Sequence, residues 1–89
     1  MEIDLTDAAK SDLKKHKLSG NKVVCKKIEN LLLAIADNPY DGIGQPEELK
    51  HDLTGFWSRH INLAHRIIYS VDEKNQLVTV HSLFGHYEK

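Results

Sequence analysis

Apolar and polar positions recur with two different periods along the chain, and the period changes near residue 40. Residues 1–5, "MEIDL", alternate apolar and acidic side chains, which favours a short strand. Thr6 then predicts the N-cap of a helix that runs to about His16. Asp7 lies close to the positive end of that helix dipole, where a carboxylate is stabilising.

A second helix is predicted after a break at residues 17–21, "KLSGN". Ser19 or Asn21 can cap it, because both side chains offer an oxygen to the first free backbone N–H groups. Its apolar positions recur at helical spacing and form one stripe, which a sheet has to cover: Val24, Ile28, Leu31 and Ile35.

The second half of the chain predicts strands. Residues 36–46, "ADNPYDGIGQP", concentrate turn residues and form a loop, because Pro39 prevents an easy continuation of the helix. Four strands are expected after it, at residues 47–52, 56–61, 65–71 and 77–84. One strand, two helices and then an antiparallel meander indicate an α+β fold, with both helices packed on one face of an antiparallel sheet.

Strand alternation gives each arginine of the sheet apolar neighbours. Trp57, Arg59 and Ile61 share one face of their strand, and Arg66 shares a face with Ile68 on the next. Trp57 is expected to pack beneath the helices. Each arginine suits a sheet edge with its stem packed and its guanidinium in water, and each equally suits a charged substrate.

Length and composition set the class of protein. The 89 residues suffice for one domain, residues 1–89, with 40% hydrophobic and 28% charged residues, which fits a globular chain and not a disordered one. No apolar run approaches the roughly 20 residues that cross a bilayer. The single cysteine, Cys25, fits a reducing compartment, so a cytoplasmic location without membrane contact is expected.

Charge argues against a protein that binds nucleic acid by bulk attraction alone, because the formal net charge is −1. Five of the six histidines lie in the second half of the chain. A metal site is not expected among them, because the spacing of His60 and His65 matches no zinc pattern.

One long motif carries a family resemblance. The run "GIGQPEELKHDLTGFWSRHI", residues 42–61, is followed by "HRIIYSV" at residues 65–71 and by "HY" at residues 86–87. Together these words resemble the YoeB/Txe toxins, which are RelE-like messenger-RNA endonucleases of bacterial toxin–antitoxin systems. The resemblance extends over nearly the whole chain, since the order of strand, helices and sheet also agrees.

The resemblance implies metal-independent cleavage of messenger RNA on the ribosome, with the ribose 2′-hydroxyl attacking the adjacent phosphate. It assigns Glu47 as general base, Arg66 as the cation that supports the phosphorane and His86 as general acid. Tyr87 matches an aromatic residue that orders the site.

Further positions match by the same resemblance. Lys50 and Arg59 correspond to basic residues that bind RNA phosphate, while His51 and His65 are expected to hydrogen-bond behind the site. No cofactor is implied. The implied partners are a cognate antitoxin of the YefM/Axe/Phd kind, the 70S ribosome and messenger RNA, and the resemblance allows a homodimer.

The residue types suit this chemistry without the resemblance. A 2′-hydroxyl is a poor nucleophile, so a group such as Glu47 must take its proton, and the departing 5′-oxygen needs a proton from a group such as His86. An arginine that is always charged, such as Arg66, can grip phosphorane oxygens in a bidentate manner.

Two departures from the family pattern keep other functions open. His60 stands where the family has a second arginine, and Phe84 and Gly85 replace an arginine and a tyrosine. A binding module that acts only through antitoxin-linked repression is the main alternative, and a free-standing ribonuclease is a third. Taken singly, Glu47 also suits a solvated loop carboxylate and Arg66 a surface ion pair.

Overall fold

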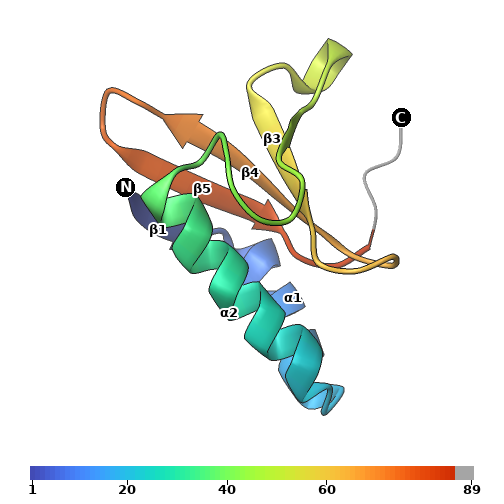
Figure 1. Ribbon diagram of the computed structural model, residues 1–89. Coiled ribbons are helices and arrows are strands. Elements are labelled where there is room, and N and C mark those ends of the chain that lie inside the picture. Colours follow the sequence, from blue (N-terminus) through green and yellow to red (C-terminus); the bar gives the residue numbers. More distant parts are fainter. Residues whose placement is uncertain (86–89) are drawn as a thin grey trace.

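The computed structural model describes residues 1–85, without the side chain of His51. Its elements follow in the order β1 (Glu2–Leu5), α1 (Asp7–Leu18), α2 (Lys22–Asp37), β2 (Glu47–Glu48), the 3-10 helix η1 (His51–Leu53), β3 (Phe56–His60), β4 (Arg66–Asp72) and β5 (Leu77–Ser82). The two helices lie together against one face of the sheet, so the predicted α+β layering is confirmed (Figure 1).

The sheet has the strand order β1-β5-β4-β3-β2. Strands β2 to β5 pair antiparallel in sequence order, as expected. The strand β1 pairs parallel to β5, so the sheet is mixed and not wholly antiparallel. The chain runs through both helices and the meander before it returns beside β1, and a parallel pair requires a long connection of this kind.

Both helices begin at side-chain caps. The Oγ1 atom of Thr6 accepts the N–H of Ala9 at 3.1 Å, and Oδ1 of Asn21 accepts the N–H of Val24 at 3.1 Å. The predicted cap at Thr6 is therefore confirmed, and Asn21, not Ser19, caps the second helix. Neither helix within residues 1–85 has the length and apolarity to cross a membrane.

Two predicted strands are shorter in the structure. The strand expected at 47–52 ends at Glu48, since the N–H of Leu53 bonds to the carbonyl of Lys50 in the turn of η1. The last strand ends at Ser82 and not at residue 84, because the N–H of Leu83 donates to the carboxylate of Asp12 on α1 at 3.0 Å. A side chain of a helix thus replaces the next sheet partner.

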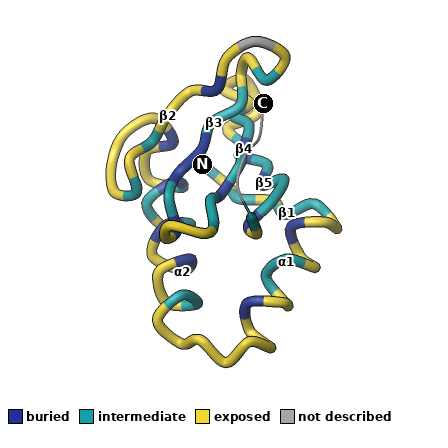
Figure 2. The backbone as a smooth tube through the Cα atoms, turned by 90° about the vertical axis from the view of Figure 1, so that its right-hand side faces the viewer, coloured by how far each residue is buried: buried dark blue, intermediate teal, exposed yellow. Residues whose placement is uncertain are grey.

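The core lies between the helices and the sheet (Figure 2). The apolar stripe of α2 supplies its lower half, as the sequence predicts, and Trp57 packs against its margin. Its fully enclosed side chains come from both helices and from the strands β4 and β5, with two more from the loops that follow β3 and β5: Ala9, Ile28, Leu31, Ile35, Ile61, Ile67, Tyr69, Val78, Val80 and Leu83.

A charged residue is the largest side chain enclosed in this core. Arg59 of β3 has 0% of its surface exposed. Its guanidinium donates to the carbonyls of Asn38 at 2.6 Å, Asp41 at 3.1 Å and Ile43 at 3.1 Å. These carbonyls belong to the loop between α2 and β2, so Arg59 fixes the path of that loop across the end of the core.

Tyr69 extends the same network. Nε of Arg59 donates to the Tyr69 hydroxyl at 3.1 Å, and this hydroxyl donates to the carbonyl of Pro39 at 2.6 Å. Burial raises the pKa of the Tyr69 hydroxyl, although the neighbouring guanidinium acts in the opposite direction. The phenol therefore stays protonated and keeps its role as a donor.

Gly44 allows the loop to approach β3 closely. Its carbonyl accepts the N–H of His60 at 2.7 Å, and its φ of +86° lies in the left-handed region. A Cβ at this position would stand 2.6 Å from Cδ2 of Leu31 and 3.2 Å from Cβ of Arg59. The position therefore requires glycine both for its backbone conformation and for space.

We expect the substitution Arg59→Met to destabilise the fold by about 3 kcal/mol or more, because four hydrogen bonds of the guanidinium are lost together and a hydrogen bond to a charged group contributes about 1.5–3 kcal/mol. Arg66→Met, one register step along on β4 and half-exposed, is the matched control and should change stability by less than about 1 kcal/mol. Urea unfolding measures both. Equal effects of the two substitutions would contradict a structural role for Arg59.

We expect Gly44→Ala to destabilise the protein by about 1–3 kcal/mol more than Gly20→Ala, because overpacking carries a cost of that size. Gly20 is a suitable control, since its φ is also positive at +75° and no atom lies within 4 Å of a Cβ built there. Thermal unfolding of both variants makes the comparison. If Gly44→Ala is as stable as Gly20→Ala, the Leu31 side chain can move away from the new methyl group without loss of stability.

Candidate functional site

The side chains of Glu47 and Arg66 share the sheet face that the helices leave uncovered. Glu47 pairs with Ser58 across β2 and β3, and His60 pairs with Arg66 across β3 and β4. Directly paired residues point to the same side of a sheet, and alternate residues of one strand do so as well. Arg59, between Ser58 and His60, points instead into the helix-covered core.

The spacing between these two residues suits a phosphodiester. They lie two strands apart, about 10 Å, and two residues apart along the strands, about 7 Å, so their backbones are separated by about 12 Å. Both side chains are long and lean over the same surface. A carboxylate and a guanidinium at that separation can reach two sides of one phosphate group.

The chain returns to this place at its last described residue. The N–H of Arg66 donates to the carbonyl of Gly85 at 3.0 Å, which extends the pairing of β4 by one bond. Gly85 directly precedes His86 and Tyr87 in the sequence. The predicted roles of His86 and Tyr87 fall on residues that lie outside the described part of the chain.

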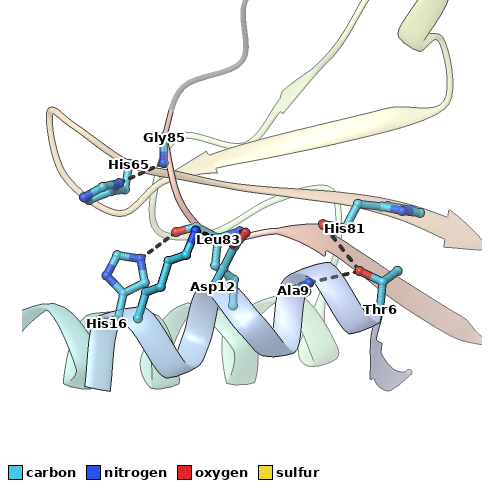
Figure 3. Close-up of polar contacts among 9 residues, drawn as sticks. Thr6, Ala9, Asp12, His16, His65, His81, Leu83 and Gly85 are labelled. Atoms are coloured by element: carbon cyan, nitrogen blue, oxygen red, sulfur yellow. Dashed lines mark hydrogen bonds and ion pairs between the residues drawn. The ribbon is translucent and has the colours of Figure 1, made fainter. Parts of the chain in front are cut away.

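The first helix holds this returning segment. Nε2 of His16 donates to the carbonyl of Leu83 at 2.7 Å, and the carboxylate of Asp12 accepts the N–H of Leu83 (Figure 3). His16 is 3% exposed. Sequence reasoning missed both residues, although Ala9, Leu13 and His16 recur at helical spacing and therefore place a histidine on the buried face of α1.

The remaining predicted positions are spread around the site. Lys50 is exposed between β2 and η1, close in sequence to Glu47. The side chain of His51 lies outside what the structure describes. His65 directly precedes β4, and its Nδ1 accepts the N–H of Gly85 at 2.8 Å, so it contacts the segment next to Arg66.

Arg59 does not belong to this surface, and its prediction as a phosphate-binding residue needs correction. The guanidinium is enclosed on the helix side of the sheet, and four of its five N–H donors are used by neutral oxygens of the protein. An RNA phosphate could reach it only if the loop at residues 38–43 opened. The motif matched the position, but strand alternation turns this side chain inward.

A β-bulge aims another histidine at the same uncovered face. The pairing of β4 with β5 shifts between Ile68 and Tyr69, which makes His81 the extra residue of β5. Nε2 of His81 lies 2.8 Å from Oγ of Ser70, and its ring contacts Phe56 at 4.8 Å. Burial lowers the pKa of His81.

Metal ligands do not gather around the site in the described residues, where no group of three or more histidine, cysteine, aspartate or glutamate side chains is close enough to hold an ion. The chemical groups that the surface offers are therefore a carboxylate, an arginine and a histidine pointing at the sheet face, with exposed lysine nearby. This set can transfer protons and bind an anion.

Comparison with known proteins identifies a family. Residues 5–87 match the family model described as YoeB-like toxin of bacterial type II toxin–antitoxin system. The toxin YoeB of Synechocystis is 44% identical over 69 residues, which cover 78% of this chain and 78% of that relative.

Solved structures agree with that match. A YoeB/ParE toxin from Agrobacterium tumefaciens superimposes with a TM-score of 0.91 at 31% identity, over 98% of this chain and all of that one. A YoeB dimer and a YoeB–YefM complex, both from Staphylococcus aureus, give TM-scores of 0.84 and 0.82 at 39% and 40% identity, over 98% of each chain.

The lowered pKa of His81 makes stability depend on pH. Below about pH 6.5 the unfolded chain takes up a proton at His81 that the folded chain takes up only at lower pH, so stability falls on acidification. His81→Gln should reduce the loss of stability between pH 7.5 and 5, as measured by urea unfolding. A variant that loses as much stability as the wild type would contradict this linkage.

Proposed function

The chain belongs to the YoeB-like toxins of bacterial type II toxin–antitoxin systems, and on that premise we propose that it is a ribosome-dependent, metal-independent messenger-RNA endonuclease. Its cleavage of message stops translation. The proposed catalytic residues are Glu47, Arg66, His86 and Tyr87.

One observation carries the proposal. Glu47 and Arg66 come from separate parts of the chain, yet they share the uncovered face of the sheet, and Gly85 is bonded to the backbone of Arg66. The residue that follows Gly85 is the proposed general acid. The geometry of the described residues supports the proposal, because the proposed base and the proposed phosphate-binding cation lie on one surface, next to the residue that precedes the proposed acid in sequence.

The proposed reaction needs two proton transfers and no added water. Glu47 takes the proton of the ribose 2′-hydroxyl, and the 2′-oxygen forms a bond to the adjacent phosphorus. Arg66 stabilises the doubly charged phosphorane. The bond from phosphorus to the 5′-oxygen then breaks, and His86 donates a proton to that oxygen. The products are a 2′,3′-cyclic phosphate and a 5′-hydroxyl end.

The ribosome supplies what the small chain lacks. A net charge of −1 and the burial of Arg59 leave few cations for holding RNA, with Lys50 the one closest in sequence to Glu47. A toxin that enters the decoding site meets message already held and extended by the 70S particle. This partnership, and a cytoplasmic location with it, follow from the proposed reaction.

The proposed regulator is an antitoxin of the YefM kind, since a similar toxin from Staphylococcus aureus forms a YoeB–YefM complex. Another structure of YoeB from that organism, 39% identical to this chain, is a dimer. We extend both states to this chain, with the antitoxin covering the uncovered sheet face and silencing it.

A binding module without catalysis is the second candidate. It is favoured by the inward position of Arg59 and by His60 at a position where the family has arginine, because both reduce the positive charge that faces RNA. Such a protein would act through its antitoxin alone. Cleavage on ribosomes separates the two candidates.

We expect the wild type to cut a defined message on 70S ribosomes. Glu47→Gln and His86→Gln should lose about a hundredfold or more in rate, as for the removal of a general base or acid, and Arg66→Ala should lose a similar amount through the loss of transition-state stabilisation. The matched control is Glu48→Gln, which removes the neighbouring carboxylate from the opposite side of the strand and should cut normally. Primer extension maps the cuts, and end-group analysis identifies the cyclic phosphate.

Absence of cutting by a folded wild type that still binds its antitoxin would favour the binding module. Cutting that persists in Arg66→Ala, or that leaves a 5′-phosphate, would refute the proposed mechanism. Equal losses in Glu47→Gln and Glu48→Gln would show that the carboxylates act on folding or binding and not as a specific base.

A further inference from the structure

The backbone of Gly85 is tied to two consecutive residues at the start of β4. Its carbonyl accepts the N–H of Arg66 at 3.0 Å. Its N–H donates to Nδ1 of His65 at 2.8 Å (Figure 3). The first bond is an ordinary sheet bond. The second one is unusual, because a side-chain nitrogen takes the place of a backbone carbonyl.

The two residues before Gly85 are fixed by the first helix. Leu83 is bonded through both polar groups of its backbone, to His16 and to Asp12. The ring of Phe84 packs against both imidazoles, at 5.1 Å from His16 and 4.4 Å from His65. Residues 83–85 are therefore held from α1 on one side and from His65 and Arg66 on the other.

The bond from Gly85 determines the protonation state of His65. A backbone N–H can only donate, so Nδ1 of His65 has to accept, and an accepting ring nitrogen carries no proton. A proton on that nitrogen would face the N–H of Gly85 and remove the bond. The observed arrangement therefore requires a neutral His65 with its proton on Nε2.

We propose that neutral His65 is a positioning residue, which holds Gly85 against Arg66 and so sets where the segment carrying His86 begins. Protonation of His65 on Nδ1 breaks this tether. The kinetic part of the inference rests on the proposed endonuclease function, whereas the tether itself does not. Acid should then loosen the path of the chain at Gly85 while the core stays folded.

Other titratable groups surround the tether and have to be separated from it. His16 of α1 meets His65 edge to face, with ring centres 4.8 Å apart. Also from α1, Nζ of Lys15 lies 5.1 Å from the Phe84 ring and 4.0 Å from Asp12, which in turn binds Leu83. His16 is the only other imidazole among these groups, so it is the one to separate from His65.

Three variants isolate the role of His65. In His65→Asn the side-chain oxygen offers an acceptor near the place of Nδ1 and does not titrate, whereas His65→Leu offers no acceptor. His16→Gln is the matched control, because its amide can still donate to Leu83 while the neighbouring imidazole is removed. Circular dichroism and urea unfolding check that each variant folds.

The direct test follows the Gly85 amide by NMR between pH 8 and pH 5. In the wild type and in His16→Gln, its proton should move upfield on acidification as the hydrogen bond is lost, with a midpoint equal to that of the His65 ring. In His65→Asn the signal should stay at the bonded position throughout this range. A Gly85 amide that ignores both pH and the His65→Leu substitution would overturn the tether.

The kinetic test uses cleavage of a defined message on 70S ribosomes. His65→Leu should lose about tenfold to a hundredfold at pH 7.5, as expected when a catalytic group shifts by about 1 Å. The cleavage rate of His65→Asn at pH 7.5 should stay within about threefold of the wild-type rate, a difference below about 1 kcal/mol in activation free energy. Its rate should also fall less steeply than the wild-type rate towards pH 5.5.

The two tests fail separately. If the Gly85 amide signal follows the titration of His65 but the protein cuts no message, the tether is supported and the endonuclease function is refuted. Full cleavage by a folded His65→Leu protein would remove the positioning role and retain the endonuclease. Equal losses in His65→Asn and His65→Leu would show that the imidazole acts by something other than accepting the bond from Gly85.

Discussion

The buried guanidinium of Arg59 is the interaction on which the rest of the fold depends. A charge in an apolar core is costly unless hydrogen bonds replace its water shell, and here three loop carbonyls and the Tyr69 hydroxyl do so. The dependence is mutual, because the same carbonyls would lose their donor if the arginine were absent. The loop after α2 is thereby fixed, and with it the starting point of β2 and the place of Glu47.

The two faces of the sheet carry different kinds of residues, one for the core and the other for the candidate site. One face carries Ile67, Tyr69 and Arg59 against the helices, and the other carries Glu47 and Arg66. The arginines of the neighbouring strands β3 and β4 therefore lie on opposite faces of the sheet and in different environments. The guanidinium of Arg59 is solvated by loop carbonyls and the Tyr69 hydroxyl and organises the fold, whereas Arg66 is half-exposed on the uncovered face.

The helices contribute to the site although they lie on the far side of the sheet. His16 and Asp12 reach from α1 to Leu83, where they end β5 and direct the chain towards Arg66. His65 completes this path from the start of β4. The departure from the family pattern at Phe84 and Gly85 fits this arrangement, because the Phe84 ring packs on two histidines and Gly85 adopts a φ of +83°.

The sequence by itself determined the layered α+β fold, the cap at Thr6, the stripe of α2 and the family, because periodicity, capping and a long motif are local properties. It also singled out Glu47 and Arg66. For the second cap it offered Ser19 or Asn21, and the structure selects Asn21. Only the tertiary structure decided that β1 pairs parallel to β5 and that the last strand ends at Ser82, since both depend on contacts between distant segments. The same holds for Arg59, for which the motif suggested an RNA contact. Its side chain lies on the inward face of β3 and is enclosed by a loop about twenty residues earlier in the chain. A contact between segments so far apart in sequence cannot be predicted from the local pattern of residues.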